Sequence, residues 1–157
     1  MTFSDQSVGA GFSPRDKDWD TEEYALGIVV KCRHLDWQVS TVAQISNSLG
    51  QILSVVNCLV LQHRVHNESS EEHNEVDRAE WRKLLRPFRN VKTLRIQNGL
   101  VKDLSRCLGS EDGELPFGLL PELYELEYYE SGNTGDVFSS FIDARRNAGR
   151  PVILVRR

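Results

Sequence analysis

The chain has 157 residues, of which 39% are hydrophobic and 27% charged, and its formal net charge is −4. This length fits one domain with a sizeable core. The acidic balance disfavours the whole-chain basic field that nucleic-acid-binding proteins use. The sequence has no apolar run of the roughly 18 residues that a membrane span needs, and no signal peptide at its start. We therefore expect an intracellular protein, cytoplasmic or nuclear, that binds neither nucleic acid nor membranes.

The beginning of the chain shows no apolar period. Residues 1–21 are rich in Gly, Ser and Asp and include Pro14, which is typical of a flexible N-terminal arm. In this arm, Trp19 either packs on the rest of the protein or contacts a partner. From residue 22 onward, short apolar β-like runs alternate with amphipathic stretches, a pattern that predicts parallel strands joined by helical crossovers. We expect a single α/β domain over residues 22–157.

An apolar pattern of the leucine-rich-repeat type recurs over residues 53–61, 88–96 and 120–128, at offsets of 35 and 32 residues. Strands over 27–33 and 151–156 extend the series at its two ends. The sequence therefore predicts a short irregular leucine-rich-repeat-like solenoid, with about five parallel strands and helical crossovers. The residues expected to point inward from the five strands are Ile28 and Val30, Leu59 and Leu61, Leu94 and Ile96, Leu126 and Tyr128, and Val152 and Leu154.

The first two crossovers carry helix signals of different strength. The first has Asp36 or Thr41 as alternative N-caps and Gly50 as a stop. The second has capping-box spacing between Asp77 and Glu80. The apolar residues of the first stripe are Val42, Ile45 and Leu49, those of the second are Trp81, Leu84, Leu85 and Phe88, and Val76 is expected to pack on Trp81. Trp37 and Trp81 are both expected in the core.

The last two crossovers are also predicted to be helical. The third is expected to stop at Gly109 in a left-handed conformation, while Thr134 caps the fourth and residues 149–151 end it. Their apolar stripes are Leu100, Val101, Leu104 and Leu108, and Val137, Phe138, Phe141 and Ile142.

Three parts of the sequence resemble the C-terminal region of F-box-like proteins of mushroom-forming (basidiomycete) fungi. They are CRHLDWQVSTVAQISNSL, WRKLLRPFRNVKTLRI, and LPELYELEYYESG followed by FIDARRNAGRPVILVRR. The resemblance covers about residues 26–157. It implies an irregular leucine-rich fold and a role in selecting targets for a ubiquitin ligase. The F-box itself, which docks on a Skp-type adaptor, is not recognised in this sequence.

Two surfaces are candidates for binding. The outward residues of the strands combine charges with an aromatic side chain, which suits a protein partner but is equally typical of solvated strands. These residues are Lys31, Arg33, Lys92, Arg95, Glu125, Glu127 and Tyr129. The basic end of the chain either clamps an acidic or phosphorylated motif or simply favours a helix dipole. Its residues are Arg145, Arg146, Arg150, Arg156 and Arg157.

Metal and catalytic chemistry are considered and not predicted. His63, His66 and His73 lie in the acidic stretch 62–77, and a solvated or partner-binding acidic loop explains them better than a metal site. The sequence has no nucleophile elbow, phosphate-binding Gly-rich loop or metalloprotease helix. We therefore expect no cofactor and no enzyme activity.

The three cysteines Cys32, Cys58 and Cys107 are an odd number at wide spacings, so we interpret them as buried thiols. A thiolate nucleophile at Cys32 or Cys107, beside His34 or His63, is disfavoured by the predicted strand and apolar stripe around these cysteines. The leading functional hypothesis is a non-catalytic protein-interaction module. The alternatives are a truncated or vestigial fragment that self-associates through its end strands, and a small enzyme of unknown chemistry.

Overall fold

The computed structural model describes most of the chain from residue 34 onward and three short earlier strands. The described ranges are 2–4, 8–10, 28–31, 34–64, 77–97, 99–109, 118–129 and 137–157. Side chains are described from residue 34 onward, apart from that of Arg64. The predicted segments that fall between these ranges, including the staple at Val76 and the cap at Thr134, lie outside the described residues.

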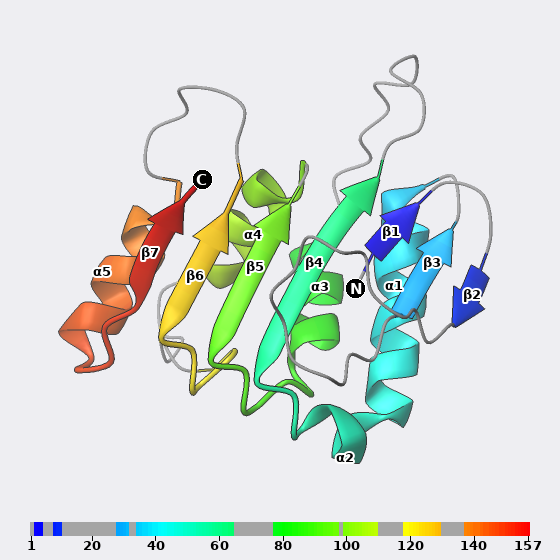
Figure 1. Cartoon of the computed structure of the whole chain (residues 1–157), viewed down its shortest axis with the longest axis horizontal. Coiled ribbons are helices and arrows are strands. Elements are labelled where there is room, and N and C mark those ends of the chain that lie inside the picture. The colour runs from blue at the N-terminus through cyan, green and yellow to red at the C-terminus, as the bar shows by residue number, and fades with distance from the viewer. Residues whose placement is uncertain are drawn as a thin grey trace.

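Within the described residues, seven strands form one sheet in the order β2-β3-β1-β4-β5-β6-β7 (Figure 1). Four of them, β4 to β7, lie side by side in chain order and all run parallel. The strands are β1 Thr2–Ser4, β2 Val8–Ala10, β3 Ile28–Lys31, β4 Cys58–Arg64, β5 Thr93–Gln97, β6 Glu125–Tyr128 and β7 Ile153–Arg156. Parallel neighbours need a crossover connection between them, and here the crossovers after β4, β5 and β6 each contain a helix.

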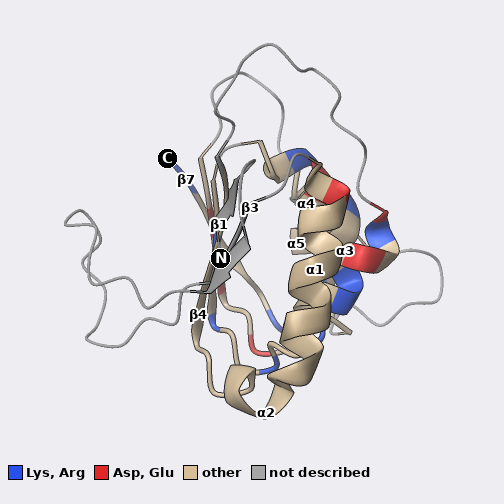
Figure 2. Cartoon of the chain, turned by 90° about the vertical axis from the view of Figure 1, so that its right-hand side faces the viewer, with Lys and Arg blue, Asp and Glu red and all other residues tan. Residues whose placement is uncertain are grey.

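The helices form a second layer on one face of the sheet (Figure 2). They are α1 Leu35–Ser48, α2 Gly50–Leu53, α3 Arg78–Leu85, α4 Val101–Leu108 and α5 Ser139–Asn147. All parallel crossovers return on the same side because the connection is almost always right-handed. The predicted α/β class is therefore confirmed, as a mostly parallel sheet, with β2 antiparallel to β3, that carries the described helices on one face.

The core lies between the sheet and the helix layer and follows the predicted repeat. Leu59, Leu94, Leu126 and Leu154 stand in register across β4 to β7, and the first three are buried. Trp81, predicted in the core, is completely buried on α3. The predicted inward positions on β4, β5 and β6 are thus confirmed, since alternate residues of a strand point to one face.

The start of the sheet differs from the expected series of five strands. The strand predicted over 27–33 exists as β3, but β1 pairs with β3 on one side and with β4 on the other. Two strands of the predicted arm, β1 and β2, therefore belong to the sheet. The rest of the arm and the boundary between residues 21 and 22 lie outside the described residues. An apolar spacing fixes which face a strand buries, but it does not reveal that a distant segment lies between two strands.

Trp37 is the clearest wrong prediction, because its side chain is 62% exposed. Helix α1 begins at Leu35, and neither Asp36 nor Thr41 is its N-cap. With this start, the helix buries Leu35, Val39 and Val42 on one side and turns Trp37 outward. The identity of a large aromatic residue suggested the core, whereas the helical phase decides its position.

Two glycines end helices differently. Gly149 follows α5 with a φ of 77°, the left-handed conformation expected of a helix stop. Gly109, the C-cap of α4, has a φ of −57°, so the predicted left-handed conformation is wrong there. Gly50, predicted to stop the first helix, instead begins the short helix α2 directly after the C-cap Leu49.

Candidate protein-binding surface

The candidate binding surface is the face of the sheet opposite the helix layer. None of the described helices lies on this face (Figure 2). The residues that alternate with the buried leucines point to it. We call them the strand surface, which comprises Cys58, Val60, Thr93, Arg95, Glu125, Glu127, Tyr129, Ile153, Val155 and Arg157.

The carboxylate of Glu127 lies at the centre of the strand surface and is contacted by three other side chains. Glu127 is only 2% exposed, and its Oε2 lies 2.8 Å from Nε of Arg95, its register neighbour on β5. Its Oε1 lies 2.5 Å from Nε of Arg157 and accepts a hydrogen bond of 3.1 Å from the Tyr129 hydroxyl. A buried carboxylate needs partners of this kind to offset its desolvation. The side chains of this charge cluster therefore hold one another in fixed positions.

Apolar side chains border the charge cluster on both sides. Val60 on β4 is the register neighbour of Arg95, and Val155 on β7 is the register neighbour of Glu127. Both valines are half-buried. Ile153, two residues before Val155 and on the same face of β7, is 61% exposed. A charged centre with an apolar border resembles the composition of protein interfaces, where Arg and Tyr are enriched.

Cys58 lies at the first position of β4 on the strand surface and is half-buried. Burial raises the pKa of its thiol, while the nearby Arg95 opposes this effect and Glu127 adds to it. The thiol therefore stays protonated at neutral pH, which does not favour a nucleophilic thiolate. The expectation of buried thiols is confirmed at Cys107, whereas Cys58 is only half-buried and Cys32 lies outside the described residues.

The structure brings together four of the predicted outward residues. Arg95, Glu125, Glu127 and Tyr129 all belong to the strand surface, although Glu127 is buried instead of solvated. Lys92 is exposed in the turn before β5 and stands apart from the strand surface. Arg33 and the side chain of Lys31 lie outside what the structure describes.

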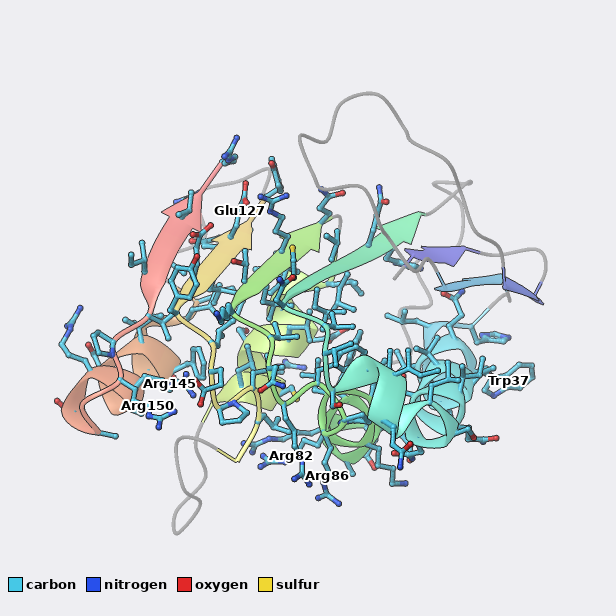
Figure 3. All side chains as sticks on the ribbon, turned by 60° about the horizontal axis from the view of Figure 1, so that its bottom comes forward. Trp37, Arg82, Arg86, Glu127, Arg145 and Arg150 are labelled. Carbon is cyan, nitrogen blue, oxygen red and sulfur yellow. The ribbon has the colours of Figure 1, made fainter. Side chains whose placement is uncertain are left out.

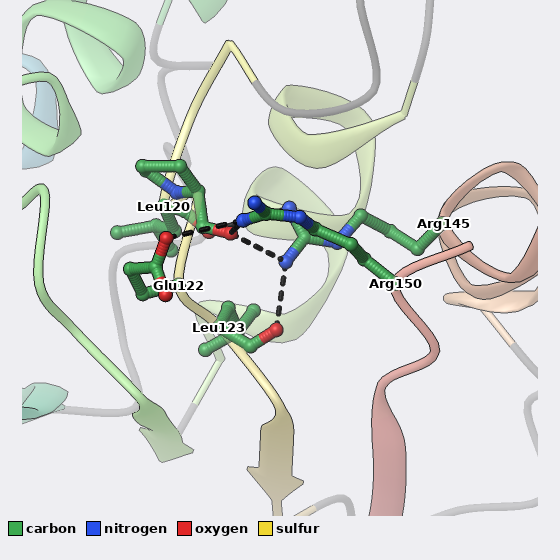
Figure 4. Close-up of polar contacts among 6 residues, drawn as sticks. Leu120, Glu122, Leu123, Arg145 and Arg150 are labelled. Carbon is green, nitrogen blue, oxygen red and sulfur yellow. Dashed lines mark hydrogen bonds and ion pairs between the residues drawn. The ribbon is translucent and has the colours of Figure 1, made fainter. Parts of the chain in front are cut away.

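Of the two interpretations of the basic end, the clamp on an acidic or phosphorylated motif does not fit Arg145, because this side chain is fully buried. Arg145 instead binds the backbone of its own chain (Figure 4). Its guanidinium donates hydrogen bonds to the backbone carbonyls of Leu120 at 3.3 Å, Pro121 at 3.3 Å and Leu123 at 2.7 Å. Leu120 has a φ of 48°, a conformation that is unfavourable for leucine, so these bonds hold a strained turn. Burial lowers the pKa of Arg145, and the neighbouring Arg150 lowers it further.

Three of the other four arginines of the basic end contact an acidic side chain. Arg150 contacts Glu122 at 3.1 Å and donates to the Pro121 carbonyl at 3.0 Å. Arg146 contacts Asp143 at 3.1 Å within α5, and Arg157 belongs to the charge cluster. Arg156 is exposed. The sequence showed five arginines together, but the partners of Arg145, Arg150 and Arg157 come from other elements and could not be inferred from it.

The exposed surface of the helix layer contains features that the sequence analysis missed. Trp37 extends outward from α1, with its ring centroid 5.0 Å from that of His34 in an edge-on contact (Figure 3). Arg82 and Arg86 lie on the outer side of α3 (Figure 3). The i, i+4 spacing of these arginines, opposite the apolar stripe of α3, was a usable signal for this basic face.

The described part of the chain contains no cluster of three or more His, Cys, Asp or Glu residues that could hold a metal ion. His63 is buried on β4, while His66 and His73 lie outside the described residues. None of the described helices is both long and apolar enough to cross a membrane.

Comparison with known proteins gives no relative for this chain. No family model matches it, and neither does any curated protein or solved structure. What the chain does must therefore follow from its own surfaces.

Proposed function

We propose that the chain is a non-catalytic protein-interaction module that binds its partner on the strand surface. By its sequence resemblance, it corresponds to the target-recognition region of an F-box-type ubiquitin-ligase subunit. The observation that carries the proposal is the one-sided helix layer, because all of the described helices lie on one face of the sheet (Figure 2). Parallel sheets are usually covered on both faces, so a sheet whose described helices lie on one face only suits a partner on the other.

The chemistry of the strand surface supports a protein partner. The charge cluster of Arg95, Glu127 and Arg157 is held by contacts within the chain, so little side-chain entropy is lost when a partner contacts it. Val155 and Ile153 beside it offer apolar area. A preorganised polar centre with an apolar border gives a partner both specificity and affinity.

We propose further that the repeat forms an irregular leucine-rich-repeat-like solenoid. Equivalent positions of the segments 53–61, 88–96 and 120–128 stand in register on β4, β5 and β6. Strand and helix alternate from β4 to β7, and each strand pairs with its neighbours in chain order. This nearest-neighbour arrangement is typical of solenoids, whose strand-lined face commonly binds partners.

The test is affinity capture from an extract of cells of the protein's own source, with the wild type and two matched variants. Thr93→Arg adds a long charged side chain to the middle of the strand surface, on β5. Ser105→Arg makes the same kind of change on α4, in the helix layer. The captured amount of proteins that bind through the strand surface should fall about tenfold or more with Thr93→Arg, which corresponds to the loss of one hot-spot contact. With Ser105→Arg the captured amount should stay unchanged.

Circular dichroism of both variants checks that they are folded. If Thr93→Arg leaves the captured proteins unchanged, the strand surface is not the binding site. The role in ubiquitin ligation has a separate test. Fusion of an F-box to the chain should cause ubiquitin transfer to the captured proteins in a reconstituted ligase reaction. If the fused chain transfers no ubiquitin to them, the target-selection role is wrong.

A further inference from the structure

Strand β7 ends the sheet with an outward backbone edge. In the described part of the chain only β6 pairs with it. The amide of Ile153 donates to the Tyr124 carbonyl at 2.7 Å, and that of Arg157 donates to the Tyr128 carbonyl at 3.0 Å. Because the backbone groups of successive strand residues point to opposite edges, the N–H and C=O groups of Val152 and Leu154 point away from β6.

The side chains of β7 do not protect this edge. Exposed edge strands are normally guarded by charges, proline or a bulge. Pro151 precedes β7 and Arg156 ends it, but Ile153, Leu154 and Val155 between them are apolar. Ile153 is 61% exposed, and Leu154 and Val155 are half-buried. An apolar edge of this kind is a template for pairing with another strand.

The sequence of β7 matches itself when two copies run antiparallel about Leu154. In this register the two Leu154 residues exchange their outward N–H and C=O groups. Ile153 then lies opposite Val155 of the second copy on the face that carries the strand surface, and such β-branched cross-strand pairs stabilise a sheet. A parallel arrangement would instead bring Arg156 of each copy together. The antiparallel register separates these charges to opposite ends of the pair.

We propose that β7 is the interface of a homodimer with two-fold symmetry, in which two β7 strands pair antiparallel about Leu154. The two sheets then form one continuous sheet, and the strand surfaces of the two copies join across the symmetry axis. A two-fold interface uses the same patch on both copies, as this register does. The contact is short, so the dimer is weak and depends on protein concentration.

Analytical ultracentrifugation tests the dimer over about 5 to 500 µM, the range in which a small interface self-associates. The wild type should pass from monomer to dimer. Ile153→Lys puts a charge opposite Val155 of the second copy and should weaken self-association about tenfold or more. Ile52→Lys is the matched control, because Ile52 is 57% exposed on α2, away from β7, and it should leave self-association unchanged.

Engineered cysteines test the register itself. In a pair centred on Leu154, the two Leu154 positions lie within the Cα separation that a disulfide spans, about 4.4–6.8 Å. The two Ile153 positions lie diagonally, about 7–8 Å apart. Leu154→Cys should therefore cross-link under mild oxidation, and Ile153→Cys should cross-link much less. The wild type treated in the same way measures the background from the native cysteines.

Three results would overturn the proposal. The first is a wild type that stays monomeric over the whole concentration range. The second is equal cross-linking of Leu154→Cys and Ile153→Cys. The third is binding of a synthetic PVILVRR peptide by a protein that remains monomeric, which would assign the β7 edge to extended peptides instead of a second copy.

Discussion

Arg145 and Arg146 are neighbours in α5 with opposite environments. Arg145 is fully buried and donates to three backbone carbonyls of the turn that precedes β6. Arg146 is exposed and forms an ion pair with Asp143, one helical turn earlier. The helix phase alone separates the two side chains. One residue therefore holds the fold, whereas the other contributes to the surface charge.

The same substitution at both positions measures this difference. Arg145→Met should lower the free energy of unfolding by about 3 kcal/mol, because it leaves buried carbonyls without donors. Arg146→Met should change it by less than about 0.5 kcal/mol, as expected for an exposed pair at i, i+3. Urea denaturation followed by tryptophan fluorescence, to which the buried Trp81 contributes, measures both. Equal losses would show that Arg145 does not hold the turn.

The residue scale is also where prediction from sequence was weakest. Alternation along a strand correctly indicated that Glu127 points to the face opposite the core, but not that two arginines bury it. One of these, Arg157, directly follows β7, which is four elements later in the chain than β5, the strand that supplies the other. Partners of this kind depend on tertiary packing, which a local pattern does not contain.

At the scale of elements, α3 shows what a local signal can predict. The Asp77 side chain accepts a hydrogen bond of 3.0 Å from the Ala79 amide, so the expected N-cap is confirmed. Glu80, the other half of the expected capping box, contacts Lys83 through its side chain. Caps and apolar stripes are local in sequence and therefore readable from it. The cap at Asp77 satisfies one of the free amides at the start of the helix.

Removal of this cap should destabilise the protein moderately. Asp77→Ala should lower the free energy of unfolding by about 1 kcal/mol, since an N-terminal amide of α3 loses its acceptor. Asp77→Asn keeps an acceptor oxygen and should restore most of the loss. Urea denaturation of the two variants beside the wild type measures the effect. A similar loss for both variants would mean that the charge of Asp77, acting on the helix dipole, matters more than the hydrogen bond.

At the scale of the whole molecule, the repeat predicted the order of β4 to β7 and the register of β4 to β6, because each of these repeats buries the same positions against the helix layer. At β7 the expected register was wrong by two residues, since Leu154 and not Val152 pairs with Leu126. The spacing of leucines was sufficient for β4 to β6. It was not sufficient at the start of the sheet, where β1 lies between β3 and β4. A three-residue strand has too few residues to show an apolar period. Strand insertions between repeats therefore escape a search for periodicity.

Leu59, Leu94, Leu126 and Leu154 stand in register across β4 to β7, so one residue type can be compared at different depths in the same core. Leu94 and Leu126 are fully buried and lie on interior strands, whereas Leu154 is half-buried on the last strand. Leu94→Ala and Leu126→Ala should each cost about 3 kcal/mol or more of unfolding free energy, because both lose buried contacts and leave a cavity.

Leu154→Ala should cost only about 1 kcal/mol, because solvent already reaches this side chain and the site can relax around the smaller residue. Urea denaturation gives the three values, and a constant dependence on denaturant would show that one cooperative unit unfolds in each case. Equal costs at all three positions would mean that β7 is buried to the same depth as β5. The outer edge of β7 would then be covered in solution. The proposed dimer covers this edge at high protein concentration. The three variants therefore have to be compared at concentrations where the chain is monomeric.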